Sequence, residues 1–145
     1  MVRDLVEGDL DWVAEQERLI FGPGAWSREL IREDFAWGMR RYRGLECDGV
    51  LCAYAIYGFD GDAFHLMNVA VTPEYQGQGC GRTLMDDVVA EAGRLGERTV
   101  WLEVAVTNAA AIALYRGYGF TDVRVRKGYY QPGHIDAIVM RADLG

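Results

Sequence analysis

A glycine-rich turn joins a strand pattern to a helix pattern near the middle of this chain. The turn runs from Gln76 to Arg82 and contains Gly77, Gly79 and Gly81. The apolar run 64–72 before it ends at Pro73 and predicts a strand. Apolar residues at helical spacing follow it: Leu84, Met85, Val88, Val89, Ala92 and Leu95. Such glycines either simply permit a turn or let the start of a helix approach an anion closely, and the residues alone leave both interpretations open.

Upstream of the turn, the pattern predicts two helices and then an antiparallel meander. Apolar spacing favours a helix over Leu10–Phe21, and Ser27 is a typical N-cap for a second helix ending at Trp37. Three strand patterns follow, and Asp-Gly pairs at 48–49 and 60–61 separate them, a strong hairpin signal. These expected strands are Tyr42–Cys47, Val50–Phe59 and Phe64–Thr72.

Downstream, the order strand, helix, strand predicts a right-handed crossover between parallel strands. The run Thr99–Val106 is almost continuously apolar, as expected for a strand buried on both faces. A helix begins at Asn108, and two last strands, Thr121–Lys127 and Ile135–Arg141, flank a loop holding Gly128, Pro132 and Gly133. Residues 1–145 are therefore expected to form a single mixed α/β domain.

Composition narrows the function before any motif is interpreted. The 145 residues carry 15 Lys and Arg against 22 Asp and Glu, a net charge of −7. This balance argues against a nucleic-acid partner and is compatible with a basic peptide. The acidic N-terminal segment is unlike a signal peptide, and no uncharged apolar run approaches the roughly 18 residues of a membrane span. A cytoplasmic protein without a membrane partner is expected.

Cysteine and histidine usage predicts reduced thiols and no bound metal. Cys47, Cys52 and Cys80 are odd in number, and no two of them form a C-x-x-C pair. His65 and His134 are the only histidines, so a four-ligand zinc site has few candidates.

The ligand of the glycine turn can be narrowed by elimination. A Walker A loop requires Lys and then Ser or Thr after its last glycine, whereas Arg82 and Thr83 follow Gly81. A Rossmann fingerprint requires a glycine where Arg82 stands, and it favours a fully parallel sheet. Neither nucleotide-binding pattern fits.

The turn instead resembles the acetyl-CoA pyrophosphate loop of the GNAT N-acetyltransferase superfamily, written Gln-x-x-Gly-x-Gly and present as Gln76, Gly79 and Gly81. The strand end 68–71 and the segments 108–115 and 119–120 also resemble that family. The resemblance implies the GNAT fold, a mixed, mostly antiparallel sheet of about seven strands with about four helices, splayed at the acetyl-CoA site. The implied acetyl-CoA contacts are Val69, Ala70, Val71, Gln76, Gly77, Gln78, Gly79, Cys80, Gly81, Arg82, Asn108 and Tyr115.

Within that family the chain is most similar to the RimI-type ribosomal-protein alanine N-acetyltransferases, through the segments 101–104, 108–115, 129–130 and 136–137. That resemblance implies Glu103 as general base and Tyr115 as general acid. It also places Trp26, Tyr129 and Tyr130 near the substrate. One departure lies early in the chain, where Ala25 stands in place of the proline usual in that group.

Considered without the family resemblance, Glu103 and Tyr115 could each have another role. Glu103 is the only charged side chain in its strand pattern, and such a residue is often simply solvent-facing or paired with arginine. Burial beside Trp101 and Leu102 would raise its pKa toward neutrality and suit it to accept a proton. Tyr115 could equally be a core tyrosine of an amphipathic helix.

The leading hypothesis is therefore Nα-acetylation of a protein N-terminus, with the N-terminal alanine of a small-subunit ribosomal protein as the implied substrate. Direct transfer is favoured over a covalent intermediate on Cys80, which has no histidine neighbour in the sequence. One alternative is acetylation of a small-molecule amine or a lysine side chain. The other is an acyl-CoA-binding module without catalytic turnover.

Overall fold

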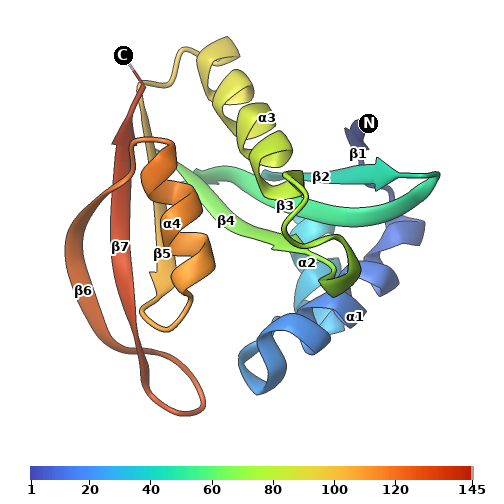
Figure 1. Ribbon diagram of the computed structural model, residues 1–145, viewed down its shortest axis with the longest axis horizontal. Coiled ribbons are helices and arrows are strands. Elements are labelled where there is room, and N and C mark those ends of the chain that lie inside the picture. Colours follow the sequence, from blue (N-terminus) through green and yellow to red (C-terminus); the bar gives the residue numbers. More distant parts are fainter. Residues whose placement is uncertain (145) are drawn as a thin grey trace.

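The computed structural model describes residues 1–144 and contains one seven-stranded sheet with the strand order β1-β2-β3-β4-β5-β7-β6 (Figure 1). Only the central pair β4–β5 is parallel, and the other neighbours are antiparallel. The strands are β1 Val2–Asp4, β2 Arg40–Cys47, β3 Val50–Asp60, β4 Ala63–Val71, β5 Thr99–Ala105, β6 Thr121–Tyr130 and β7 Ile135–Asp143. The helices are α1 Leu10–Phe21, α2 Arg28–Trp37, α3 Cys80–Arg94 and α4 Ala109–Gly117.

Helices cover both faces of the sheet, as Figure 1 shows, and each pair buries its own core. Alternating side chains of β3 divide between the two cores because successive strand residues point to opposite faces. Ala53 and Ala55 pack with α3, whereas Tyr54 and Ile56 pack with α1 and α2. The predicted mixed α/β class is confirmed.

The local signals in the sequence are largely confirmed. Helix α1 has the predicted bounds, and the Ser27 side chain accepts a hydrogen bond from the Leu30 backbone N–H at the start of α2. Both residues of the Asp48-Gly49 turn have positive φ, as a tight hairpin requires. The three-residue strand β1, which the pattern did not predict, pairs with β2 at the edge of the sheet.

Two predictions about the later strands are wrong. Strand β5 is not buried on both faces: Val100, Leu102 and Val104 are buried, but the residues between them are only half-buried. The reason is that the core under α1 and α2 is formed with β2, β3 and β4 and includes no residue of β5, so that face of β5 is only partly covered. Strand β6 continues to Tyr130, and Gly128 therefore lies within a strand instead of a loop.

The parallel pair β4–β5 opens like a fork. The two strands are paired only at Phe64 with Val100 and at His65 with Trp101. Beyond that point β4 stays paired with β3, and a register shift at Ile56/Tyr57 leaves Met67 as the extra residue of a bulge. A bulge bends its strand, so the end of β4 turns away from β5 and its edge is left without a strand partner.

Among the described residues, no helix is both long and apolar enough to cross a membrane.

Candidate active site

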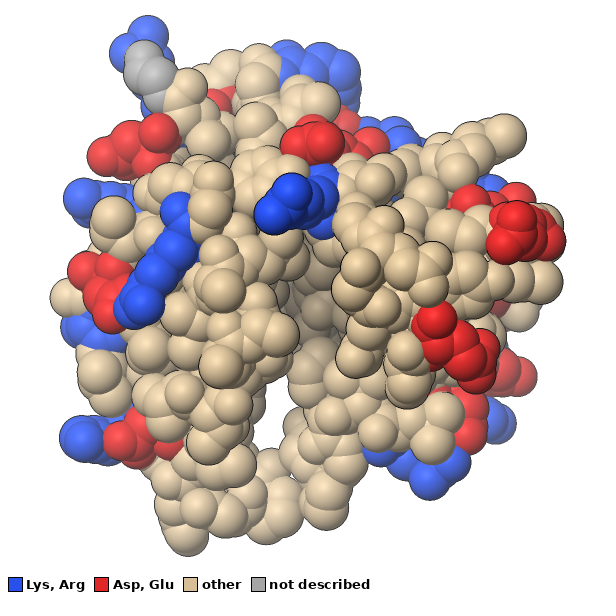
Figure 2. Space-filling model, in the orientation of Figure 1, with Lys and Arg blue, Asp and Glu red and all other residues tan. Residues whose placement is uncertain are grey.

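A pocket of about 490 Å³ occupies the fork between β4 and β5. Its walls come from α1, the turn before α2, the diverging ends of β4 and β5, the start of α4 and the loop between β6 and β7. Figure 2 shows the corresponding hollow between the two halves of the molecule, with an opening near its lower end and mainly uncharged residues around it. The fold thus creates a site where two strands stop pairing.

Two loops approach each other across one end of this pocket. Gly24, in the turn between α1 and α2, lies so near Gln131 that a Cβ added there would be 3.0 Å from the Gln131 carbonyl oxygen. Pro23, Ala25 and Trp26 line the pocket beside this contact. The absence of a side chain at Gly24 therefore lets the two loops enclose the pocket.

The glycine turn continues the site beyond the end of β4. The Gln76 side chain donates a hydrogen bond of 3.0 Å to the Val71 carbonyl and ties the turn to the free edge of the strand. Gly77 and Gly79 have φ of 79° and 83°, which side chains rarely adopt. Gly79 precedes the first residue of α3, whose N-terminus has no side-chain cap. The first amides of α3 are therefore left without an internal partner.

A close helix contact supports the backbone of this turn. A Cβ at Gly81 would lie 3.1 Å from the Leu114 side chain, so α3 and α4 approach each other where residue 81 is small. Gln76, Gly77, Gln78, Gly79 and Arg82 are exposed. An anion can therefore reach these amides from solvent, and the helix dipole favours negative charge at that end.

Helix α4 brings two residues to the pocket: Asn108, which precedes its first residue, and Tyr115, which lies near its C-terminal end. The Asn108 side-chain oxygen accepts a hydrogen bond of 3.2 Å from the Ala111 N–H, so Asn108 caps α4 and its amide nitrogen remains for other contacts. Tyr115 is buried against Phe120, and burial alone raises its pKa above the usual phenol value. Its hydroxyl thus keeps its proton at any neutral pH.

Glu103 lies in the pocket, but its environment differs from the expected one. His65 Nε2 is 2.6 Å from Glu103 Oε2, and an Arg126 guanidinium nitrogen is 3.3 Å from Oε1. The hydrogen bond to His65 lowers the pKa of Glu103, with a smaller contribution from Arg126, and outweighs burial. The expectation of a raised pKa is therefore wrong. The cause is a histidine from β4 that the parallel register places next to β5.

This ion pair predicts a pH-dependent contribution to stability. The folded pKa of Glu103 lies below its unfolded value of about 4.5, so the stabilisation is present above pH 4.5 and is lost as the pH falls through the folded pKa. We expect Glu103→Gln to be less stable than the parent by about 1–3 kcal/mol at pH 7 and by a smaller margin at pH 3. Urea unfolding at both pH values measures this. The exposed Glu33→Gln on α2 is the control, and an equal deficit at both pH values would contradict the pairing.

The three predicted substrate contacts separate into two groups. Trp26 and Tyr130 line the pocket, from opposite sides of it. Tyr129 does not line the pocket, although its ring packs edge to face on that of Tyr130 with 5.0 Å between the ring centroids. Tyr129 is 41% exposed, and the Arg126 guanidinium lies over its ring at 4.2 Å. Of the predicted β4 contacts, Val69 lines the pocket, whereas Ala70 is buried toward α1.

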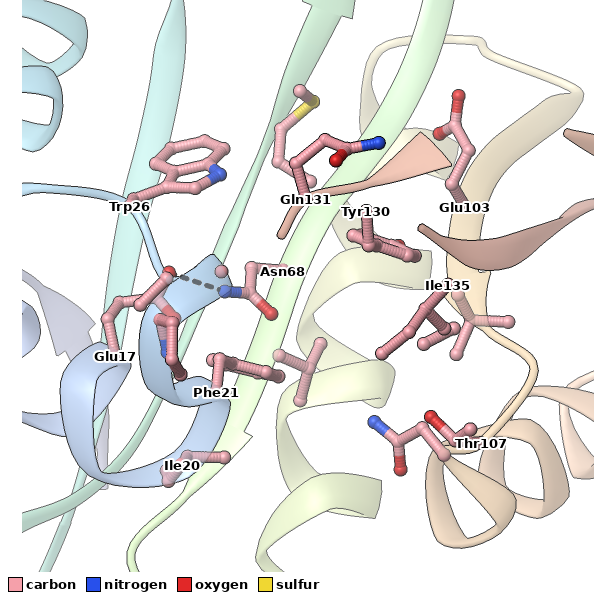
Figure 3. Close-up of a pocket in the computed structure, with 18 of the residues that line it drawn as sticks. Glu17, Ile20, Phe21, Trp26, Asn68, Glu103, Thr107, Tyr130, Gln131 and Ile135 are labelled. Carbon is pink, nitrogen blue, oxygen red and sulfur yellow. Dashed lines mark hydrogen bonds between the residues drawn. The ribbon is translucent and has the colours of Figure 1, made fainter. Parts of the chain in front are cut away.

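Three pocket-side residues were not predicted: His65, Glu17 and Asn68. Glu17 on α1 is 1% exposed and accepts a 2.7 Å hydrogen bond from the Asn68 side chain on β4 (Figure 3). The available signal was a carboxyl among the apolar positions of the predicted helix Leu10–Phe21, since Glu17 follows Val13 by four residues. Nothing in the sequence spacing pairs it with a residue on the central strand.

The three thiols form a cluster behind the glycine turn. The sulfurs of Cys47, Cys52 and Cys80 come from β2, β3 and α3 and lie within 4.8 Å of one another. Burial raises the pKa of Cys52 and of Cys80, so both remain protonated and are weak nucleophiles. Sequence spacing gave no sign of this grouping, and the absence of a metal stays a prediction.

A free strand edge, a glycine turn that opens onto a helix N-terminus, and a pocket lined by Glu103 and Tyr115 come together at one fork. Residues 10–120 match the model of the Acetyltransferase (GNAT) family, and the chain belongs to that family. It is therefore an acetyltransferase by descent.

Particular relatives narrow the comparison. The chain is 38% identical over 130 residues to the [ribosomal protein bS18]-alanine N-acetyltransferase of Salmonella typhimurium, covering 81% of this chain and 88% of that one. It is 34% identical to the N-alpha-acetyltransferase RimI of Mycobacterium tuberculosis, over 97% of this chain and 90% of that one. The crystal structure of the Escherichia coli ribosomal-protein-S18-alanine N-acetyltransferase superposes with a TM-score of 0.84 at 34% identity, covering all of this chain and 94% of that one.

Proposed function

We propose that this protein transfers the acetyl group of acetyl-CoA to the N-terminal amine of a protein, and that the substrate is the N-terminal alanine of a small-subunit ribosomal protein. The observation that carries this proposal is the fork between β4 and β5, which joins a free backbone edge to an enclosed pocket. The names of the relatives supply the substrate class. Such a substrate would be met in the cytoplasm.

The residues present fit a CoA thioester. The free edge of β4 at Val69–Val71 offers backbone groups to an extended pantetheine arm, as an added strand would use them. The uncapped amides after Gly79 offer hydrogen bonds to a diphosphate, and the glycines leave room for it. Asn108 and Tyr115 both line the pocket, where the thioester would end.

The reaction requires a neutral amine, a stabilised oxyanion and a proton for the leaving thiolate. An α-amine has a pKa near 8, so about a tenth of it is neutral at pH 7. Glu103 is ionised throughout this range and accepts the amine proton as the C–N bond forms. Backbone N–H groups of β4 stabilise the tetrahedral oxyanion. Tyr115 donates its proton to sulfur as the C–S bond breaks, leaving N-acetyl peptide and CoA thiol.

The raised pKa of Tyr115 and the lowered pKa of Glu103 constrain this sequence of events. A phenol whose pKa lies above 10 cannot protonate a free thiolate of pKa about 8.5 without cost. The proton must therefore move while the C–S bond is breaking. Glu103 is a weak base because its pKa is lowered, so the amine proton must be removed during attack on the thioester and not before it.

A competition experiment tests the proposed activity. The protein is incubated with acetyl-CoA and three acceptors: a peptide beginning with alanine, the same peptide with a blocked N-terminus and a free lysine, and a polyamine. We expect mass spectrometry to find acetyl groups only on the free α-amine. Acetylation of the lysine or polyamine alone would replace this proposal with the side-chain or small-amine alternative. Binding of acetyl-CoA without transfer to any acceptor would favour a non-catalytic module.

A further inference from the structure

The wall of the pocket formed by α1 contains a buried carboxyl group that the proposed transfer chemistry does not use. Glu17 is 1% exposed, and its Oε1 accepts the 2.7 Å hydrogen bond from Asn68 Nδ2. Its other oxygen, Oε2, is buried without a hydrogen-bond partner among the described residues. Desolvation of an acid is costly, so a buried carboxyl beside a pocket requires a physical reason.

The hydrogen bond to Glu17 determines how the Asn68 amide is oriented. Only the NH₂ end of an asparagine amide can donate to a carboxylate, so the carbonyl end must point the other way. In Figure 3 the Asn68 oxygen points away from Glu17 and toward the middle of the pocket, on the side of Tyr130 and Ile135. The pocket therefore presents one fixed hydrogen-bond acceptor next to the free edge of β4.

We propose that Asn68 is an amine-binding residue whose side-chain oxygen accepts an N–H of the substrate's α-amine, and that Glu17 is the positioning residue that holds the Asn68 amide in this orientation. This inference rests on the proposed function and extends it to the binding of the nucleophile. One N–H bonded to Asn68 leaves the nitrogen lone pair free to face the thioester carbon.

The charge near Glu17 and Asn68 is compatible with binding of a cationic or strongly polarised group of the substrate. Burial raises the pKa of Glu17 to about 7, partly offset by the side chains of Tyr54 on β3 and Asn68 on β4. Burial raises the pKa of Tyr42 on β2, and Glu17 in turn helps to raise it; the Tyr42 hydroxyl donates a hydrogen bond to Asp34, which pairs with Arg40. Above pH 7 Glu17 is ionised, and its charge strengthens the acceptor end of the Asn68 amide.

Glu103 serves a different purpose in the same pocket. Both of its oxygens are engaged, one by His65 and one by Arg126, whereas the Asn68 oxygen faces open space. Figure 3 shows Glu17 and Glu103 on opposite sides of β4. The amine is thus held from the α1 side and loses its proton toward the β5 side.

The test is steady-state kinetics with an alanine-initiated peptide and acetyl-CoA, using Asn68→Ala, Glu17→Gln and the double variant. For Asn68→Ala we expect kcat/KM for the peptide to fall about 10- to 100-fold, mainly through KM, with the Kd of acetyl-CoA within twofold of the parent. Glutamine at 17 keeps the shape and still accepts from Asn68, so Glu17→Gln removes only the charge. In the parent, peptide kcat/KM should rise as Glu17 ionises near pH 7, and Glu17→Gln should lack this rise.

The double variant separates action through Asn68 from an independent effect. Because Glu17 acts through Asn68, adding Glu17→Gln to Asn68→Ala should cause less than a twofold further loss. Glu91→Gln is the matched control. Glu91 is a buried carboxylate on α3 that pairs with Arg41 of β2 and Arg94 of α3, and it does not line the pocket. It should leave peptide kcat/KM and its pH profile unchanged.

Each other outcome overturns the inference. For Asn68→Ala, these outcomes are an unchanged peptide KM or a loss of acetyl-CoA affinity as large as the loss of peptide kcat/KM. For Glu17→Gln, the outcome is a kcat/KM that still rises near pH 7. For the double variant, it is a loss equal to the product of the two single losses. Failure of the proposed function is recognised separately, because the parent and Glu91→Gln would then bind acetyl-CoA without acetylating the peptide. Each single variant tests the proposal separately, so if one of them folds poorly, the other still decides the outcome.

Discussion

Tyr115→Phe is expected to lower kcat for peptide acetylation by about two to four orders of magnitude, the usual contribution of a general acid. The substitution removes one hydroxyl and keeps the ring that packs on Phe120. Because the phenol pKa is raised by burial, the parent should show no loss of kcat from tyrosine ionisation up to about pH 10. Rapid-quench measurement of the transfer step, with calorimetry for acetyl-CoA affinity, checks both expectations.

Tyr57→Phe is the matched control for this prediction. Tyr57 is also buried, and its hydroxyl donates to Asp87 at 2.9 Å on the α3 side of the sheet, away from the pocket. Its loss should reduce stability without changing kcat. If Tyr115→Phe turned over within twofold of the parent, another group would have to protonate the thiolate.

The second large effect is expected at the glycine turn. Gly79→Val should weaken acetyl-CoA binding on the order of 100-fold, because a branched side chain at φ of 83° distorts the amides that we propose bind the diphosphate. Calorimetric titration of the folded variant with CoA measures the loss. Gly77 shares the left-handed conformation and should respond in the same direction.

Gly61→Val separates backbone strain from loss of the binding site. Gly61 has φ of 64° in the turn between β3 and β4, and a Cβ at either glycine would meet nothing within 4 Å. Both variants should therefore lose similar stability, but only Gly79→Val should lose CoA affinity. Equal affinities in the two variants would show that these amides do not hold the diphosphate.

The elements of the fold were largely predictable because their signals are local. Asp-Gly turns placed the hairpins, Ser27 caps α2 as expected, a helix does begin after Asn108, and α1 has the predicted bounds. Strand β1 was missed because three residues carry no periodic pattern. Strand β6 was ended too early because its irregular pairing with β7 tolerates Gly128, which the pattern indicated as a turn residue.

The chemistry of the site was less predictable, because it depends on contacts between distant segments. The pKa of Glu103 was expected to rise on burial, but His65, 38 residues earlier in the chain, lowers it. The carboxyl whose pKa does rise is Glu17, which is 51 residues from its partner Asn68. Tyr129 was grouped with Tyr130, and the two rings do contact each other, but only Tyr130 lines the pocket.

By itself, the amino-acid sequence determined where this chain turns, which stretches become helix or strand, and where its backbone is bare enough to approach an anion. These properties arise from steric limits and hydrogen bonds within a few residues. Only the tertiary structure decided which carboxyl meets a cation and which is buried beside an amide. Ionisation depends on desolvation and on charges a few ångströms away in space, and the separation of β4 from β5 sets both.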